Sequence, residues 1–355
     1  MKKILVCFDG TGNEPEDADP EFDDAGALED ENISNVLKLH LRAGGRLHQR
    51  PELALGQVAL YFGGPGTRGG LLRRVVESGL APNSLKDITD RALAELRVVY
   101  VAGDEISVFG FSRGAAIARR FVSHLQTHGL EEREKGAGSG TPIPVRFVGV
   151  WDTVLSEGAP EKNQNVRDPA ELGESDGIGP AVNRVFHLVS IDDPRKVFTP
   201  TLFAPDDRVT EVWFPGVHSD IGGGYRCSGL SDIALEFMIM QATREAGLTF
   251  LQPKDVDVAG ATGGRVDAGD LESKPDPSAC DHAAGFDKFL KDFIDALAPR
   301  QVIALGGGVP LLHASVIERG SRQRYSPKNL RTLRHKIYGQ SDKEYPDFDS
   351  HFQGY

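Results

Sequence analysis

Cysteine is scarce in this sequence, and long apolar runs are absent from it. The cysteines are Cys7, Cys227 and Cys280, with no Cys-Xaa-Xaa-Cys pair, so the sequence indicates no disulfide framework and fits a reducing compartment. The apolar run after the two N-terminal lysines is shorter than the roughly 7–15 residues of a signal peptide. No run reaches the roughly 18 residues of a transmembrane helix. We therefore expect a protein that stays in the cytoplasm of the producing cell or leaves it by a leaderless secretion route.

An excess of basic residues is also missing, and this argues against nucleic acid as a partner. The chain has 52 acidic and 40 basic residues and a formal net charge of −12, whereas phosphate backbones are bound by clustered lysine and arginine. The histidines and cysteines do not have zinc spacing. The glycine-rich stretch at residues 63–70 lacks the lysine and hydroxyl residue that end a phosphate-binding loop. The sequence therefore predicts no metal and no other cofactor.

The apolar residues that are present predict an α/β fold. They make up 39% of the 355 residues, and short β-branched runs alternate with helical stretches along the chain. Such runs suit strands that are buried on both faces of a parallel sheet. We expect one domain over residues 1–355, with a doubly wound, mostly parallel sheet, helices on both faces and long loops over the site. A polar insertion at about 251–285 and a polar C-terminal tail at about 335–355 interrupt the pattern. The expected strands cover residues 4–8, 58–62, 106–109, 147–150, 185–191 and 209–214. The expected helices cover 34–42, 84–100, 113–126 and 231–246, of which the last two are the clearest.

A Gly-Xaa-Ser-Xaa-Gly motif is centred on Ser112, between an apolar strand-like run and a helical run. This context is that of a nucleophile elbow, in which a tight strand-to-helix turn lifts the serine hydroxyl clear of the sheet. Gly110 and Gly114 would leave room where side chains would collide with the neighbouring strand and helix. The motif therefore predicts Ser112 as a catalytic nucleophile.

A serine hydroxyl is a weak nucleophile and needs an adjacent base, which an acid orients. In enzymes with a nucleophile elbow of this kind, the acid and then the histidine follow the serine in the chain. We favour Asp220 as the acid, because it follows a later strand and adjoins a glycine run, with Asp152 as the alternative. We favour His313 as the base, because it lies between an apolar run and a helical stretch, with His218 as its rival at the rim of the site.

The turn after the first expected strand contains Gly10, Thr11 and Gly12. Its glycines would let backbone donors approach a substrate, so we interpret it as a loop of the oxyanion hole. The amide of Arg113, the residue after the nucleophile, would complete the hole. A glycine-rich turn without such a role is the alternative.

The same turn has some likeness to the Asp-Xaa-Asp-Gly-Thr motif of haloacid dehalogenase phosphatases. Cys7 stands where those enzymes have their nucleophilic aspartate, so the phosphoryl acceptor is missing. Asp9 is therefore interpreted as a residue that orients the loop or lies at the rim of the site.

Six blocks of the sequence resemble one known family. They are CFDGTGN at 7–13, YVAGDEISVFGFSRGA at 100–115, VWDTV at 150–154, HLVSIDDPRKVF at 187–198, WFPGVHSDIGGGY at 213–225 and HASV at 313–316. The family is an α/β-hydrolase domain, formerly of unknown function, that includes the catalytic part of type VI secretion phospholipase effectors. The resemblance implies a Ser-Asp-His triad, which maps here to Ser112, Asp220 and His313.

The resemblance also implies an activity and partners. The family hydrolyses acyl esters, and phospholipids in its effector branch, so we expect an acyl ester or phospholipid substrate, peripheral membrane contact, and a secretion or immunity partner. Nothing after His313 resembles the membrane-engaging regions that effectors often carry. A small-molecule carboxylesterase and a non-catalytic binding module with the hydrolase fold are therefore the alternatives.

Overall fold

The fold is described from a computed structural model of the chain. It describes residues 1–10, 21–22, 28–47, 50–65, 82–130, 141–155, 178–263, 266–280, 282, 298–340 and 343–352. Thr11 and Gly12, which we expected in the oxyanion loop, lie outside these ranges.

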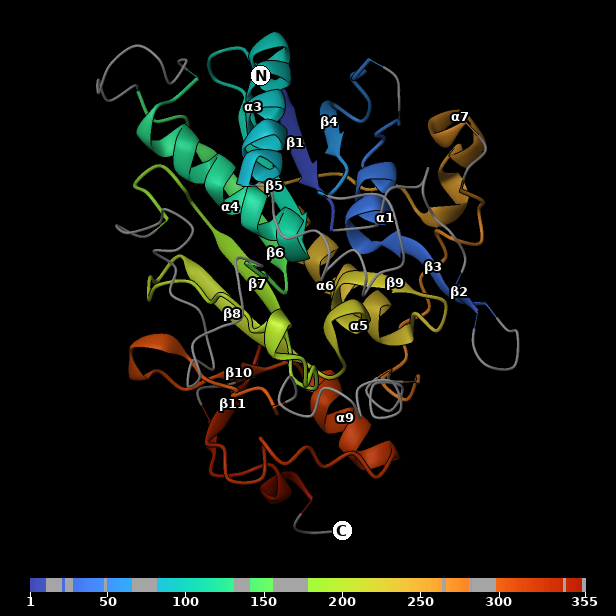
Figure 1. Ribbon diagram of the computed structural model, residues 1–355, viewed down its shortest axis with the longest axis vertical. Helices are drawn as coiled ribbons and strands as arrows, with labels where there is room; N and C mark the ends of the chain where they lie inside the picture. Colours follow the sequence, from blue (N-terminus) through green and yellow to red (C-terminus); the bar gives the residue numbers. More distant parts are fainter. Residues whose placement is uncertain are drawn as a thin grey trace.

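One large sheet forms the centre of the described chain (Figure 1). It has nine strands in the order β12-β11-β10-β8-β7-β6-β5-β1-β4, and every neighbouring pair is parallel except β11 and β12. The mostly parallel α/β fold expected from the sequence is therefore confirmed. The strands are β1 Lys3–Phe8, β4 Gln57–Phe62, β5 Glu105–Phe111, β6 Val145–Trp151, β7 Val185–Ser190, β8 Val209–Phe214, β10 Leu311–Leu312, β11 His335–Ile337 and β12 Glu344–Tyr345.

Helices cover both faces of this sheet. Successive side chains of a strand point to opposite faces, so an apolar strand has two apolar faces that must be buried. Ile4, Val6 and Phe8 of β1 pack in the cluster that includes α3 (Pro82–Val99) and α4 (Ser112–Thr127). Leu5 and Cys7 pack on the other side, with α1 (Asn35–Arg42) and α6 (Gly229–Ala246). Both faces of the strand are therefore apolar, as the unbroken run at residues 4–8 predicts.

A second, smaller sheet extends the α1 side of the molecule. It has the order β2-β3-β9, from β2 (Glu21–Phe22), β3 (Leu28–Ser34) and β9 (Gly223–Tyr225). The polar insertion includes α7 (Val258–Thr262), and its Val258, Ala261, Val266 and Leu271 pack in one cluster with Leu37 and Leu41 of α1. The described part of the insertion therefore packs against α1.

The C-terminal residues do not form the polar tail that we expected. β11 and β12 extend the large sheet, and α9 (Ala314–Arg322) lies with them at that end of the molecule (Figure 1). His335 is fully buried, and its Nε2 lies 2.8 Å from Nε2 of His351. The expectation failed because short strands joined by polar turns carry too few apolar residues to show a strand pattern. In the described parts of the chain, no helix has the length and apolar character needed to cross a membrane.

Candidate active site

Ser112 lies at the sharp turn from β5 into α4, with a φ of +57°. A non-glycine residue rarely adopts this left-handed conformation. A Cβ atom on Gly110 would lie 2.6 Å from the carbonyl oxygen of Gly114, and one on Gly114 would lie 2.2 Å from the carbonyl oxygen of Asp9. Both contacts are too close, so these positions must be glycine for the strand, the turn and the helix to pack. The elbow geometry expected from the motif is therefore present.

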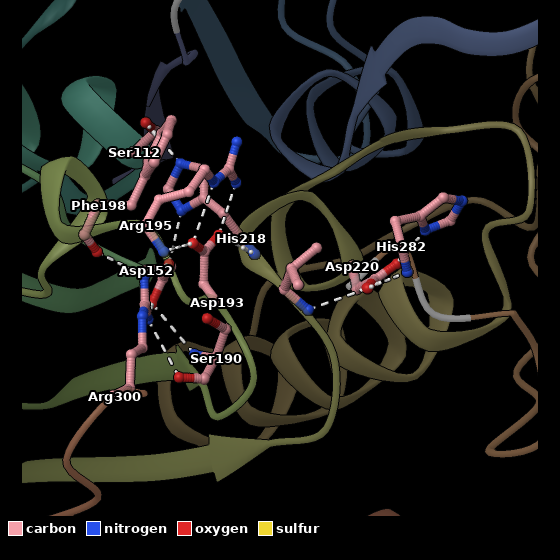
Figure 2. Close-up of polar contacts among 11 residues, drawn as sticks. Ser112, Asp152, Ser190, Asp193, Arg195, Phe198, His218, Asp220, His282 and Arg300 are labelled. Atoms are coloured by element: carbon pink, nitrogen blue, oxygen red, sulfur yellow. Dashed lines mark hydrogen bonds and ion pairs between the residues drawn. The ribbon is translucent and has the colours of Figure 1, made fainter. Parts of the chain in front are cut away.

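His218 is the imidazole that contacts this serine. Its Nε2 lies 2.7 Å from Oγ of Ser112, and its Nδ1 lies 2.5 Å from Oδ2 of Asp152 (Figure 2). Asp152 directly follows β6, and His218 begins α5 (His218–Gly222) shortly after β8. Because the carboxyl ends of parallel strands meet at one edge of a sheet, three residues far apart in the chain come together there. The ionised carboxylate can only accept, so Nδ1–H donates to it and Nε2 accepts from the serine hydroxyl.

Asp152 is fully buried and accepts four hydrogen bonds. Its Oδ1 accepts from the backbone N–H of Ser190 at 3.1 Å and from Nη1 of Arg300 at 2.6 Å. Its Oδ2 accepts from His218 and, at 2.9 Å, from Nη2 of Arg300. Burial raises the pKa of this carboxyl, but Arg300 and His218 lower it more, so its pKa lies well below the ordinary value. Asp152 is therefore a fixed, ionised acceptor for the imidazole.

Two aromatic rings enclose the imidazole of His218. The ring centroids of Phe111 and Phe198 each lie 4.7 Å from that of His218. Burial lowers the pKa of His218, and the attraction of Asp152 only partly offsets it. The imidazole is therefore held in its neutral, proton-accepting form at neutral pH.

A second buried ion pair supports the backbone of His218. Its N–H donates to Oδ2 of Asp193 at 3.1 Å, and Asp193 is held by the guanidinium of Arg195 at 2.5 and 3.0 Å. Burial raises the pKa of Asp193, but Arg195 outweighs it and the pKa falls to about 2. This pair fixes the point where α5 begins and so fixes the imidazole.

Asp220 does not act on Ser112 or on the imidazole that contacts it, contrary to our expectation. Its Oδ2 accepts from the backbone N–H of Val217 at 2.9 Å, which caps α5, and its Oδ1 lies 2.7 Å from Nδ1 of His282 (Figure 2). The expectation failed because the carboxylate that contacts the imidazole follows β6, the immediate neighbour of the strand that leads to Ser112. A carboxylate three residues into a helix caps that helix instead.

His313 is not at the serine either. It caps α9, where its Nδ1 accepts from the backbone N–H of Ser315 at 3.2 Å, and its ring stacks on Phe214 with the centroids 4.4 Å apart. Burial lowers the pKa of His313 to about 4. Apolar neighbours indicated a firmly held histidine, but they did not indicate which face of the sheet it lies on. His218, the alternative to His313, occupies the position next to Ser112 that we had assigned to His313.

Asp9 organises the turn after β1, as one interpretation of the sequence held. It is fully buried, and its Oδ2 accepts from the hydroxyl groups of Ser34 and Tyr61 at 2.6 Å each. Its Oδ1 accepts from the N–H of Gly10 at 2.6 Å. The N–H of Gly10 therefore faces Asp9 in this structure and not a substrate oxygen.

Arg113, expected as an oxyanion donor, begins the helical residues after Ser112 and is buried. Its Nη2 lies 3.5 Å from the carbonyl oxygen of Pro65. The first N–H groups of a helix have no partner within the helix and carry its positive end. The backbone N–H of Arg113 therefore lies at the positive end of α4, next to Ser112.

A disulfide joins Cys227 to Cys280, which corrects the expectation that the cysteines are unpaired. It ties the chain after β9 to the described end of the insertion. There the ring of His282 stacks on Tyr225 with the centroids 3.7 Å apart and contacts Asp220. The pairing was missed because the cysteines lie 53 residues apart in the sequence, with no framework pattern.

Three functional neighbours were not predicted from the sequence. Arg300 had no signal, because an isolated arginine beyond a polar insertion looks like a surface residue. Asp193 and Arg195 lie in a block that we compared with the known family, but nothing in their spacing indicated a contact with His218. Among the residues that the structure describes, no group of three or more histidine, cysteine, aspartate or glutamate side chains could hold a metal ion.

Solved structures similar to this chain have low sequence identity. An uncharacterized protein from Pseudomonas aeruginosa is 20% identical with a TM-score of 0.45, over 82% of this chain and 50% of that one. A Tle1 effector bound to the VgrG spike of the type VI secretion system is 23% identical with a TM-score of 0.34, over 63% of this chain and 51% of that one. Thermogutta terrifontis esterase 2 is 16% identical with a TM-score of 0.32, over 70% of this chain and 85% of that one. The chain spans about half the length of the first two proteins. No curated protein matches it.

Comparison with known families gives a match over most of the chain. The profile described as the catalytic domain of Tle1-like phospholipase effectors of type VI secretion matches residues 2–138 and 130–241. These residues include β1, the serine turn, Asp152 and His218. The chain belongs to the family of Tle1-like phospholipase effector catalytic domains.

Proposed function

We propose that this chain is a serine hydrolase that cleaves acyl ester bonds of phospholipids, with Ser112 as nucleophile, His218 as general base and Asp152 as the acid that orients it. One observation carries the proposal: His218 bridges the other two, with Nε2 2.7 Å from the serine Oγ and Nδ1 2.5 Å from the carboxylate. These separations lie within the reach that proton transfer needs. The positive φ of Ser112 supports it, because strained backbone of this kind is concentrated at functional sites.

The proposed reaction has two halves. Oγ of Ser112 attacks the ester carbonyl while its proton passes to Nε2 of His218, and the carbonyl oxygen becomes an oxyanion. When the ester C–O bond breaks, the leaving alkoxide takes that proton and the acyl group stays on the serine. Water then attacks the acyl-enzyme, gives a proton to His218, and releases the carboxylic acid as the proton returns to Ser112. Asp152 stays ionised throughout and stabilises the imidazolium.

Stabilisation of the oxyanion is proposed to come from the backbone. The N–H of Arg113 lies in the first turn of α4, where the helix dipole favours negative charge. The turn after β1 remains the proposed source of a second donor. Gly10 would contribute its N–H only after releasing Oδ1 of Asp9, which now accepts from it.

The substrate class is proposed from the family, whose members are described as phospholipase effectors. A small-molecule carboxylesterase would use the same chemistry, so the two are separated by substrate and not by mechanism. The alternative of a non-catalytic binding module is disfavoured by the geometry. Such a module has no need of a serine, an imidazole and a carboxylate in hydrogen-bonded sequence, with the serine in a strained conformation.

Delivery by a type VI secretion apparatus is also proposed. A Tle1 effector is described as bound to the VgrG spike, and we infer a spike protein as a carrier for this chain, an immunity protein as its inhibitor, and contact with a membrane surface as the place of action. Co-purification of the chain with a VgrG spike protein would support the carrier. Secretion that is unchanged in a strain lacking the apparatus would contradict it.

The test uses the purified chain, phospholipid vesicles and soluble p-nitrophenyl esters. We expect release of fatty acid from the vesicles, with a loss of ~10⁶-fold in kcat for Ser112→Ala, by analogy with other serine hydrolases. Ser123→Ala, which removes a second hydroxyl from α4 without touching His218, is the matched control and should keep its activity. Hydrolysis of the soluble esters alone would identify a carboxylesterase. No turnover of either substrate by folded protein would refute the proposed function.

A further inference from the structure

Arg300 makes more contacts with the proposed acid than the reaction scheme uses. Its guanidinium donates to both oxygens of Asp152, at 2.6 and 2.9 Å, and also to the carbonyl oxygens of Ser190 at 3.0 Å and Phe198 at 2.5 Å. The side chain is 3% exposed. An arginine that is this deeply buried is stable only when its charge is paired, and here both terminal nitrogens of the guanidinium donate to acceptors. The Arg300–Asp152 ion pair is therefore an integral part of the structure of the site.

The backbone of Arg300 is fixed as firmly as its side chain. Nδ2 of Asn329 donates to the carbonyl oxygen of Arg300 at 3.0 Å and to that of Ile191 at 3.1 Å. This amide links the segment that carries Arg300 to the end of β7. The backbone that carries the guanidinium is thus held in place. The planar guanidinium can donate two parallel hydrogen bonds to a carboxylate, which the ammonium group of a lysine cannot do.

Asp152 needs such a support because its own backbone is strained. Its φ is +40°, a conformation rarely adopted by residues with a side chain. The carboxylate must nevertheless lie in line with Nδ1 of His218. Two parallel bonds from Arg300 fix both the position and the rotation of the carboxylate plane, which a single bond does not.

Each carboxylate that faces His218 is paired with a guanidinium. On its Nδ1 side are the carboxylate of Asp152 and the guanidinium of Arg300, and on its backbone side are the carboxylate of Asp193 and the guanidinium of Arg195. The other contacts that His218 makes with described residues of neighbouring elements include the uncharged hydroxyl of Ser112 on α4 and the rings of Phe111 and Phe198. Asp220, on the same helix, is turned away to Val217 and His282.

We propose that Arg300 is a positioning residue of the ester hydrolysis proposed above: its guanidinium fixes Asp152 for His218 and cancels the charge that this carboxylate would otherwise impose on the imidazole. An unpaired carboxylate at 2.5 Å favours the imidazolium and so raises the pKa of a histidine. With Arg300 in place the acid still orients His218, but burial dominates and the pKa of His218 is lowered. The base therefore stays unprotonated, and competent, into mildly acidic solution.

The test compares Arg300→Met with wild type by the pH dependence of kcat/KM on an ester substrate. Loss of the guanidinium should move the acidic limb of the profile upward by about one to three pH units. It should lower kcat with little change in KM, because Arg300 touches no substrate. Arg208→Met is the matched control: it breaks another Arg–Asp pair, with Asp206, that does not contact His218, and its acidic limb should stay in place.

Arg300→Lys carries the test if Arg300→Met does not fold. Lysine keeps the positive charge but cannot donate two parallel hydrogen bonds to Asp152, so kcat should fall at least ~10-fold. The acidic limb of the pH profile should remain near that of wild type. Wild-type kcat in this variant, or an acidic limb in Arg300→Met that is unmoved or shifted downward, would overturn the proposal.

Failure of the proposed function is distinguished by a direct titration. The imidazole of His218 is followed by ¹³C NMR in Ser112→Ala and in the Ser112→Ala, Arg300→Met double variant. A higher pKa in the double variant supports the role of Arg300 even if no ester is hydrolysed, and equal values contradict it even if wild type is active.

Discussion

Removal of the Cys227–Cys280 disulfide should lower stability by an amount that follows from its place in the chain. The bridge closes a loop with a sequence separation of 53 residues. In the chain-entropy account, a loop of this length restricts the unfolded chain by about 4 kcal/mol at 25 °C. For a chain of this size, that corresponds to a fall in Tm of about 5 °C. We therefore expect the Cys227→Ser, Cys280→Ser double variant to unfold about 5 °C below wild type.

The assay is thermal unfolding of wild type and of the double variant, each with and without a phosphine reductant. Reductant should bring wild type to the Tm of the double variant and leave the double variant unchanged. Cys7 is common to all samples and is buried in β1, so it does not contribute to the difference. His218 keeps its contacts with Ser112 and Asp152, so ester turnover at 20 °C should change little. An unchanged Tm on reduction, or loss of turnover without unfolding, would refute this reasoning.

Three further outcomes are expected. Gly114→Ala should cost at least ~1–3 kcal/mol of stability and most of the activity, because its Cβ would lie 2.2 Å from a carbonyl oxygen at the end of β1; equilibrium urea unfolding measures it. Asp152→Asn should reduce kcat by ~10⁴-fold, and Asp220→Asn far less; equal losses would contradict the assignment of the acid. Burial lowers the pKa of both His40 and His313 to about 4, so the unfolded chain binds more protons between about pH 6.5 and 4. The free energy of unfolding should then fall as pH drops through this range, by at most about 3 kcal/mol for each histidine, and His313→Asn should remove one such contribution.

Local patterns were sufficient for the six adjacent strands β8-β7-β6-β5-β1-β4 of the large sheet and for the serine turn. The run at residues 4–8 is apolar at every position, and the structure buries both faces of β1. Gly110 and Gly114 flank Ser112 because side chains there would meet backbone atoms. Each inference depends on residues that are neighbours in the sequence, so the sequence contains the necessary information. The family resemblance, carried by such blocks, is confirmed.

The partners of the serine depend on contacts between distant segments. Asp152 and His218 meet Ser112 only because β5, β6, β7 and β8 are adjacent in the sheet, an order that no local pattern states. His313 has the apolar surroundings of a well-held histidine, yet it caps α9. Arg300 lies 148 residues from the carboxylate that it clamps. Long-range pairing of this kind is decided by packing, and a single sequence does not reveal it.

Active-site labelling tests the central assignment most directly. A fluorophosphonate reacts with a serine that an adjacent imidazole activates, so the labelling rate reports this contact without any choice of substrate. The account predicts fast labelling at Ser112 in wild type and in His313→Asn, and none or very slow labelling in Ser112→Ala and His218→Asn. Loss of labelling in folded His313→Asn, with full labelling in His218→Asn, would contradict it.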